Sequence, residues 1–418
     1  YKYDEKGNLV ETATYNAENK LAPGADGVAV VRTDFDDSGF ETRTAYFDEN
    51  NQPVLSRDGY AAIEYEYDDF GFRSREVYAG VDGKPVVSRR GYASLTMKND
   101  ARGNLLGVAQ FGVDGKPALD EQGAAETRWT LNERGLTLEI ANFGGDGKPA
   151  VVKDQYSKMV RVLDDRGWPT SISFLGPDGK PMVNKDAVAR IDYAYDERGN
   201  TARESFFDAE GKATISVKGY SSVIRIFDER DRATSQTYLD TESKPALSVD
   251  GYARMTSKYD SRGRLVEETY LDADNAAAWT ADGFSRIRHT YDPRGNRVET
   301  GYLGADEKPS YNRDGYCNAR FEHDAFGRTV RESYLGPEGG PAVHRLGYAS
   351  LVRVFNKRGQ VEREEYFGAD AKPTLCAEGY FRFVREYDVL GNETRSQAFG
   401  TDEKPIVTVK GYASMRQA

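Results

Sequence analysis

Residues 251–282 read GYARMTSKYDSRGRLVEETYLDADNAAAWTAD, and the architecture follows from this stretch because its pattern recurs at one fixed interval along the 418-residue chain. With Gln155 and Ala187 as exceptions, glycine stands at the same phase at positions 27, 59, 91, 123, 219, 283, 315, 347, 379 and 411. A fixed period without insertions indicates one small unit stacked many times. We therefore expect a partial repeat at residues 1–26, twelve repeats over 27–410, and the start of another at 411–418. The chain is expected to be part of a longer polypeptide.

The first half of the repeat has the pattern of a β-strand. We number the places of each repeat from one to thirty-two, with Gly251 at place one. Places three, five and nine are small, apolar and aromatic in turn (Ala253, Met255 and Tyr259), and polar residues stand between them. Alternation of this kind over about eight residues predicts a half-buried strand.

A turn and a second strand follow. Asp or Asn stands at place ten in all thirteen copies, and Gly at place thirteen in twelve of them, as in Asp260-Ser-Arg-Gly263. Asp or Asn at the start accepts a backbone N–H, and Gly at the end adopts positive φ, which is typical of a type I turn. The next segment, 264–271, is rich in Val, Thr, Tyr and Leu together with Glu. The repeat is therefore predicted to contain a β-hairpin.

A second turn has the ideal form Gly-x-Asp-Gly-Lys-Pro, as at 112–117 and 176–181. Proline cannot donate a ladder hydrogen bond, so it should lie where none is required. A short extended segment then leads to the next repeat, and no part of the chain has a helical period. The predicted fold class is all-β, with tandem 32-residue hairpins forming an elongated superhelical or solenoid-like sheet.

The stretches Tyr195-Asp-Glu-Arg-Gly-Asn200, Tyr291-Asp-Pro-Arg-Gly-Asn296 and Tyr259-Asp-Ser-Arg-Gly-Arg264 resemble the YD repeats of Rhs-type and teneurin-like proteins. The likeness covers the turn and its two strands in nearly every repeat. It implies hairpins wound into a spiral sheet, which in that family forms a large shell, and proteins that are secreted or displayed on cell surfaces. The interval here is rigid and includes the added Asp-Gly-Lys-Pro turn, unlike the shorter and irregularly spaced YD repeats.

The composition restricts the partners. The net charge is −11 and charged residues make up 30% of the chain with both signs interspersed. No basic stripe is present to neutralise phosphates, so we expect no nucleic-acid binding. No run of about 18 apolar residues occurs, so no membrane insertion is expected in this segment. Two cysteines, Cys317 and Cys376, exclude a disulfide framework, and Cys317 stands where most repeats have Ala or Ser, as expected for a small buried residue.

Catalytic and metal-binding motifs are absent from the sequence. The three histidines stand at unrelated places, and His323 replaces an aromatic residue at place nine, which favours a packed or turn-bonding imidazole. Asp272 and Asp274 alternate in the second turn, but most repeats offer a single carboxylate there with a lysine two places later. Ordinary turn chemistry is favoured over Ca²⁺ binding. We expect no enzyme activity, no catalytic residue, no cofactor and no metal.

Two sets of residues are candidate partner surfaces. Place two is Tyr or Phe in ten of thirteen copies, and alternation places it on the strand face opposite places three, five and nine. These rings either pack between repeats or form an exposed ladder for sugars or partner chains; the set is Tyr60, Tyr92, Tyr220, Tyr252, Tyr348 and Tyr380. Place seven varies most between repeats and is either unconstrained surface or a recognition surface; its aromatic members are Tyr65, Trp129, Tyr193 and Phe321.

These observations lead to a functional expectation. The chain is read as a non-catalytic repeat array of bacterial origin, acting in an extracellular, cell-surface or periplasmic setting as a spacer or protein-binding surface. The alternatives are a glycan-binding adhesin that uses the tyrosine ladder, and an Rhs-like shell segment that encloses a toxin. The expected partner is thus a protein or a glycan.

Overall fold

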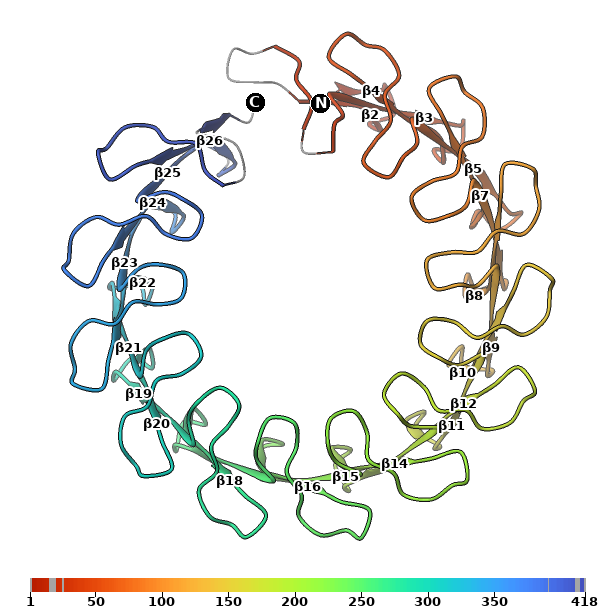
Figure 1. Ribbon diagram of the computed structural model, residues 1–418. Coiled ribbons are helices and arrows are strands. Elements are labelled where there is room, and N and C mark those ends of the chain that lie inside the picture. The colour runs from red at the N-terminus through yellow and green to blue at the C-terminus, as the bar shows by residue number, and fades with distance from the viewer. Residues whose placement is uncertain (1, 15–19, 25, 390, 410–413, 417–418) are drawn as a thin grey trace. The chain divides into compact units, whose positions relative to one another are not determined.

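The computed structural model describes residues 2–14, 20–24, 26–389, 391–409 and 414–416, and every regular element in these ranges is a β-strand. The chain divides into two compact units. The first contains the residues up to Ala194 together with Glu204–Val217, and the second contains Tyr195–Arg203 and the residues from Lys218 onward. In each unit the strands lie side by side in one layer, with loops on both sides of it (Figure 1).

The strands of the first unit, with the hairpin at which the units divide, are β1 (Lys2–Tyr3), β2 (Leu9–Ala13), β3 (Val30–Phe35), β4 (Glu41–Phe47), β5 (Ala62–Tyr67), β6 (Arg73–Ala79), β7 (Ser94–Asn99), β8 (Leu105–Phe111), β9 (Glu126–Leu131), β10 (Thr137–Phe143), β11 (Lys158–Leu163), β12 (Pro169–Leu175), β13 (Arg190–Tyr195) and β14 (Thr201–Phe207). Those of the second unit are β15 (Ser222–Phe227), β16 (Ala233–Leu239), β17 (Arg254–Tyr259), β18 (Leu265–Leu271), β19 (Arg286–Tyr291), β20 (Arg297–Leu303), β21 (Asn318–His323), β22 (Thr329–Leu335), β23 (Ser350–Phe355), β24 (Val361–Phe367), β25 (Arg382–Tyr387), β26 (Glu393–Phe399) and β27 (Ser414–Arg416).

The strands keep the period of the sequence. The first strand of each hairpin begins at the same place of its repeat, for example β3 at Val30, β5 at Ala62 and β7 at Ser94. Within each unit, strands that are consecutive in the chain pair antiparallel. The prediction of an all-β fold built from tandem hairpins is confirmed.

The tight turn of each hairpin forms as the sequence predicts. In the turn between β5 and β6, the Asp68 side chain accepts hydrogen bonds from the backbone N–H groups of Phe70 and Phe72, at 3.0 and 2.9 Å. Gly71 closes the turn by donating to the Asp68 carbonyl oxygen at 2.9 Å, and its φ is +81°. The carboxylate therefore satisfies donors that a turn leaves unpaired.

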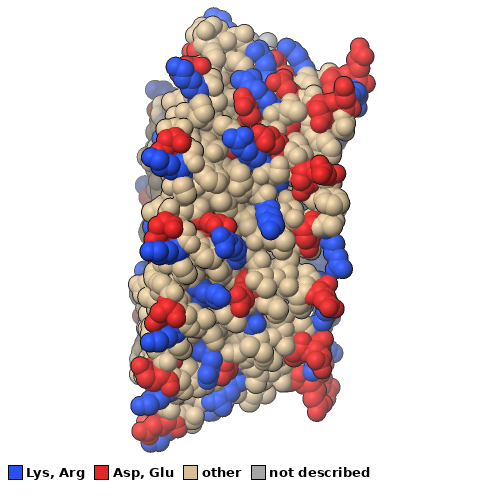
Figure 2. Space-filling view, turned by 90° about the vertical axis from the view of Figure 1, so that its right-hand side faces the viewer, with Lys and Arg blue, Asp and Glu red and all other residues tan. Residues whose placement is uncertain are grey.

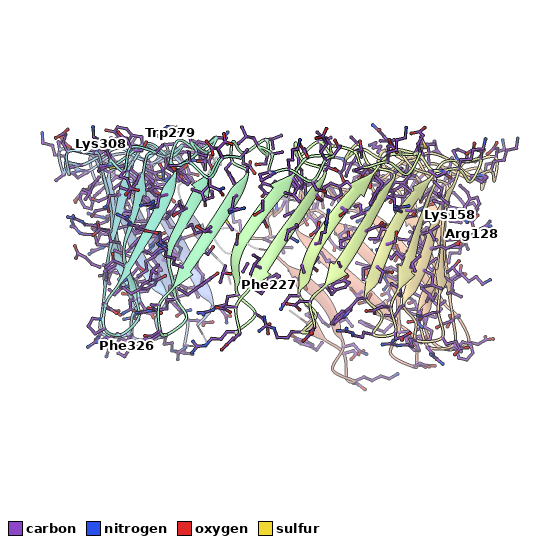
Figure 3. All side chains as sticks on the ribbon, turned by 90° about the horizontal axis from the view of Figure 1, so that it is seen from below. Arg128, Lys158, Phe227, Trp279, Lys308 and Phe326 are labelled. Atoms are coloured by element: carbon purple, nitrogen blue, oxygen red, sulfur yellow. The ribbon has the colours of Figure 1, made fainter. Side chains whose placement is uncertain are left out.

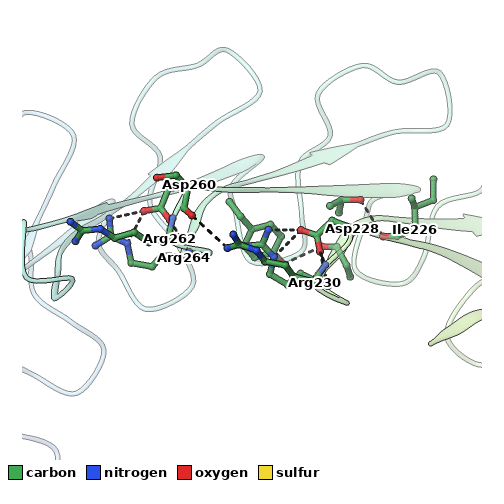
Figure 4. A network of polar contacts seen from close by, with 11 residues as sticks. Ile226, Asp228, Arg230, Asp260, Arg262 and Arg264 are labelled. Atoms are coloured by element: carbon green, nitrogen blue, oxygen red, sulfur yellow. Dashed lines mark hydrogen bonds and ion pairs between the residues drawn. The ribbon is translucent and has the colours of Figure 1, made fainter. Parts of the chain in front are cut away.

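Arginines link one tight turn to the next (Figure 4). Arg264 Nε donates to the Asp260 carboxylate at 2.7 Å, and the Arg264 guanidinium lies 4.5 Å from the ring centroid of Tyr291 in the following repeat. Arg262 donates from Nη1 to the carbonyl oxygen of Pro293, 31 residues later, at 2.8 Å. The turn at Asp260 is thus held by its own aspartate and also contacts the next turn.

The other end of the hairpin carries a longer connection with two turns. After β6, Gly80 donates to the Lys84 carbonyl oxygen at 2.8 Å, and Pro85 forms an isolated bridge with Ala79 in which its missing N–H is not needed. A further turn begins at Ser88, which the repeat pattern alone does not single out, and closes when Ser88 N–H donates to the carbonyl oxygen of Tyr92 at 2.9 Å. We call this end the loop edge and the opposite end the hairpin edge.

Figure 3 shows both edges in the second unit. Phe326 lies in a tight turn at the hairpin edge, whereas Trp279 and Lys308 lie in connections at the loop edge.

The two faces of the sheet differ in character. Because residues directly opposite each other share a face, Ile63 and Tyr78 lie on one face and Glu66 and Arg75 on the other. The first, the tyrosine face, carries places five, seven, eighteen and twenty. The second, the ion-pair face, carries places four, six, eight, seventeen, nineteen and twenty-one. Acidic and basic side chains lie next to one another over the surface seen in Figure 2.

One prediction about the faces is wrong. Alternation placed the place-two tyrosines opposite place five, but Tyr60 packs in one cluster with Ile63 and Tyr78 on the tyrosine face. The reason is that β5 begins only at Ala62, and Gly59, with φ of +87°, still belongs to the preceding turn. The period of two holds inside a strand and does not extend into the turn before it.

Among the described residues, the structure contains no helix with the length and apolar character needed to cross a membrane.

Candidate functional site

The place-two tyrosines are core residues of the tyrosine face. Five of the six candidates are 7% exposed or less, and Tyr252 is half-buried; the five are Tyr60, Tyr92, Tyr220, Tyr348 and Tyr380. Their rings contact place-twenty rings, as when Tyr78 lies 4.8 Å from Tyr60 and 5.8 Å from Tyr92. This arrangement corresponds to the packing alternative, in which the rings pack against one another on the tyrosine face.

Burial also raises the pKa of tyrosines on the tyrosine face. It raises the pKa of Tyr252, and the neighbouring phenols of Tyr238 and Tyr270 raise it further. Burial is likewise the main cause of the raised pKa of Tyr366, followed by the charge of Glu364. These phenols therefore stay protonated at neutral pH and serve as packing groups.

The place-seven aromatics are half-buried on the same face. Tyr65 packs against the cluster of Tyr60 and Tyr78, and the guanidinium of Arg73 lies 3.9 Å from its ring centroid. Phe321 packs against the corresponding cluster of the second unit. Trp129 stands directly opposite Ile140, and Tyr193 is half-buried in β13. The structure thus places all four among the contacts of the sheet.

At two of the repeats in which place seven is arginine, the neighbouring strands supply carboxylates. Arg353 and Arg385 both bind Glu364, each at 3.0 Å, and Arg353 also contacts Glu332 on the preceding strand. At Arg353 and Arg385 the charge at place seven is therefore matched by glutamates at place eighteen of the adjacent strands.

The histidines and cysteines have structural surroundings. His289 Nδ1 lies 2.9 Å from Thr300 Oγ1, and burial lowers the pKa of its imidazole. His323 Nε2 lies 2.8 Å from the carbonyl oxygen of Arg297, 26 residues earlier, so it contacts the backbone of the preceding repeat and not a turn. Cys317 and Cys376 are free thiols and buried, and Cys317 confirms the prediction of a small buried residue.

The second turn uses its carboxylates for the backbone. Asp272 accepts hydrogen bonds from the N–H groups of Asp274 and Ala276, at 2.9 and 2.8 Å. In repeats with Asp-Gly-Lys, the lysine ammonium approaches the aspartate, as with Lys116 and Asp114 at 3.2 Å. In the part of the chain that the structure describes, no group of three or more His, Cys, Asp or Glu side chains is placed to hold a metal ion.

The structure reveals a candidate surface that the sequence reasoning overlooked. Place twenty-nine is a large apolar residue in every one of the twelve repeats, and each of these residues is 39–62% exposed at the loop edge. We call this set the edge row; its members are Leu55, Val87, Leu119, Val151, Val183, Ile215, Leu247, Trp279, Tyr311, Val343, Leu375 and Val407. In the sequence, these residues form a strict period of one apolar residue per repeat. Such a period is normally assigned to a core.

Backbone geometry makes the edge-row side chains point away from the tyrosine cluster. Val86 packs into the tyrosine cluster, so the next residue, Val87, points away from it. In six repeats the carbonyl oxygen of the edge-row residue lies within 3.4 Å of the position that a Cβ on the place-one glycine of the same repeat would take. A Cβ on Gly251 would lie 2.7 Å from the carbonyl oxygen of Trp279, and φ at Gly251 is +87°. Both the close approach and the positive φ require glycine there.

No family model and no curated protein matches the chain. Among solved structures, the crystal structure of TcdB2-TccC3 has 13% sequence identity and a TM-score of 0.28, covering 99% of this chain and 22% of that one. The Photorhabdus luminescens Tc holotoxin pore has 12% identity and a TM-score of 0.26, covering 96% and 25%. The chain thus spans about a quarter or less of these two chains. The tyrosine-rich hairpins described above keep the resemblance to YD repeats that the sequence shows.

Proposed function

We propose that this chain is a non-catalytic repeat scaffold that binds a protein partner along its loop edge. The observation that supports the proposal is the edge row, which presents one exposed apolar side chain per repeat without exception. Exposed apolar side chains with polar surroundings are found at many protein interaction sites. In keeping with the sequence analysis, we propose an extracellular or bacterial envelope setting.

The chemistry of the row favours a protein partner over a glycan. Ten of its twelve members are Leu, Val or Ile, and only Trp279 and Tyr311 are aromatic. Aliphatic side chains gain most from contact with other apolar side chains, whereas the tyrosine ladder that a glycan would have used is buried. The spacing supports an extended partner, because two strands per repeat separate consecutive members by roughly 10 Å.

Neighbouring turns supply a polar border. In the first unit, Lys84 lies 3.7 Å from Asp82, and the same pair recurs as Lys116 with Asp114 and Lys148 with Asp146. These exposed pairs sit in the turn that precedes the edge-row residue of their repeat. An apolar centre with a charged rim is the usual composition of a non-obligate protein interface.

A double substitution in the first unit tests the proposal. Val87→Asp with Leu119→Asp places two charges in consecutive members of the edge row, and Phe70→Asp places one on an exposed apolar residue at the hairpin edge as a control. Each protein is immobilised and exposed to envelope and secreted proteins of the organism that encodes it. We expect the wild type and the Phe70 variant to retain a common protein that the double variant loses, with unchanged thermal unfolding. Equal capture by all three proteins would contradict a role for the edge row.

A further inference from the structure

Glu267 occupies a place between two cations on the ion-pair face of the second unit. Its carboxylate is 2.8 Å from Lys258 Nζ and 2.9 Å from Arg288 Nε, and its side chain is only 13% exposed. The strand register produces this contact, because Glu267 in β18 lies directly opposite Lys258 in β17 and Arg288 in β19. The two cations lower the pKa of Glu267 against the opposing effect of burial, which is the largest single influence on it.

The same three places in the first unit contain two cations and no carboxylate. Lys98, Gly107 and Arg128 lie five repeats before Lys258, Glu267 and Arg288, and they have the same register. Gly107 in β8 is directly opposite Lys98 in β7 and Arg128 in β9. The missing side chain leaves a hollow of about 560 Å³ in the sheet surface, lined by Thr96, Lys98, Gly107, Glu126, Arg128 and Thr130 among others.

The charge of the hollow is partly unbalanced. In the part of the chain that the structure describes, Lys98 makes no ion pair, whereas Glu66, at the same place of its repeat, pairs across the strands with Arg75 at 2.7 Å. Arg128, labelled in Figure 3, binds Glu126 through Nε and Nη2, at 2.6 and 2.7 Å. A guanidinium has five N–H donors, so its Nη1 donors remain for a further acceptor.

We propose that the hollow at Gly107 binds a carboxylate ligand in the position that the Glu267 side chain fills in the second unit. Lys98 supplies an ammonium group and Arg128 an N–H donor, and Thr96 and Thr130 line the same hollow. The ligand is a carboxylate on a short aliphatic stem, either a free small acid or a glutamate side chain of an acidic peptide. The site lies on strands and is independent of the edge row.

Binding is tested on the full chain with propionate, which has the stem and carboxylate of a glutamate side chain. The side-chain Hε–Cε resonance of Lys98 is followed by NMR, with propionamide as the uncharged control and Lys84, which already lies near Asp82, as an internal reference. We expect saturable shifts at Lys98 with propionate and none with propionamide. A peptide of six glutamates, compared with a peptide of six glutamines, distinguishes a side-chain carboxylate from a free acid. If the glutamate peptide binds more tightly than the glutamine peptide, the ligand is a glutamate side chain. If propionate binds and neither peptide does, the ligand is a free small acid. Equal responses to propionate and propionamide would overturn the proposal.

A substitution at Gly107 can supply the carboxylate from within the chain. Gly107→Glu recreates the arrangement of Lys258, Glu267 and Arg288, and the added side chain fits, because a Cβ on Gly107 meets nothing closer than 3.8 Å and φ at Gly107 is not positive. Gly107→Gln fills the same space without charge. We expect both variants to abolish propionate binding, and the glutamate variant alone to unfold about 2 °C higher than the glutamine variant. A glutamate variant that still binds propionate, or that unfolds at or below the temperature of the glutamine variant, would contradict the assignment.

The reverse change gives an independent measurement. Glu267→Gly opens the corresponding place in the second unit, and Lys258 should then respond to propionate as Lys98 does. The wild-type protein, in which Glu267 fills that place, should show no response at Lys258. A response at Lys258 in the wild type would show that propionate binds exposed lysines without regard to the hollow, and would overturn the proposal.

Discussion

The hydroxyl group of Tyr291 donates a hydrogen bond to the carbonyl oxygen of Leu265, 26 residues earlier, over 2.8 Å. Place nine makes the same contact to the preceding repeat in other copies, from Tyr67 to Glu41 and from Tyr387 to Val361, both at 2.9 Å. Asn99 and His323 stand at place nine and reach the equivalent carbonyl with an amide and an imidazole. In these repeats, the residue before the turn aspartate therefore connects neighbouring hairpins.

Removing this hydroxyl should weaken the contact between two repeats. Tyr291→Phe keeps the ring under the Arg264 guanidinium but leaves the Leu265 carbonyl oxygen without that donor. We expect a loss of about 1 kcal/mol in the free energy of unfolding, measured with urea. Tyr311→Phe, at an exposed ring of the edge row, is the matched control and should change little. Equal stability of the two variants would contradict the role of the Tyr291 hydroxyl.

The place-one glycine should tolerate substitution less than a turn glycine with open surroundings. Gly251→Ala forces a side chain into positive φ and against the Trp279 carbonyl oxygen, 2.7 Å from the Cβ. Gly339→Ala has a similar φ of +78°, but nothing lies within 4 Å of its Cβ. We expect the Gly339 variant to lose about 1 kcal/mol and the Gly251 variant at least twice as much, in thermal or urea unfolding. Similar losses would show that the close contact with the Trp279 carbonyl oxygen carries no cost.

Ala187 offers a stabilising change. It stands where most repeats have glycine, and its φ is +63°, a conformation that costs a non-glycine residue roughly 1 kcal/mol. Ala187→Gly should therefore raise the free energy of unfolding by about 0.5–1 kcal/mol. Ala194→Gly, in the exposed part of β13, should lower it by a similar amount. Destabilisation by the Ala187 variant would contradict the backbone assignment.

Acidification should destabilise the second unit through His344. Its ring packs against Tyr316, Tyr334 and Tyr348, and burial lowers the pKa of the imidazole from its ordinary value of 6.5, with Asp314 opposing this effect and Arg345 adding to it. The unfolded chain then takes up a proton before the folded chain does. The contribution of the neutral His344 ring to the free energy of unfolding is fully present above pH 6.5. It falls as the pH decreases from 6.5 to the lower pKa of His344 in the folded chain, by at most about 1.4 kcal/mol per pH unit.

Urea unfolding at pH 7.5 and 5.5 measures this effect. His344→Asn is the suitable variant, because Asn184 and Asn312 stand at the same place and their side chains accept the equivalent turn hydrogen bonds. The variant should lose less stability on acidification than the wild type. His289, whose pKa burial also lowers, is present in both proteins and contributes equally. An identical pH dependence in the two proteins would show that His344 does not supply it.

Local features of the fold could be predicted because their causes are close in sequence. Asp260 and Gly263 belong to one short motif and determine one turn, and alternation from Arg254 to Tyr259 determines one strand. The same rule failed at Tyr60, because the sequence does not show where a preceding turn ends. The packing of Tyr60 against Tyr78 depends on a loop that brings place two back beside place twenty.

The candidate surfaces were harder to predict for two physical reasons. A period of apolar residues normally indicates a core, yet Val87 is held outward by a backbone that places its neighbour Val86 inside. The hollow at Gly107 depends on cross-strand register, which brings Lys98 and Arg128 to either side of it although they belong to different repeats. In the sequence, the glycine by itself does not indicate that a carboxylate is missing between two cations.

Every strand-to-strand contact within the described residues joins strands that are consecutive in the chain, and each hairpin begins at the same place of its repeat as the one before it. Loss or gain of one complete repeat would leave the hairpins on either side with partners of the kind they already have. A change of any other length would break a turn, a bridge or a cross-strand pair. Evolution can therefore lengthen or shorten such a protein by complete repeats. An insertion of partial length marks a place where the regular strand pairing is interrupted.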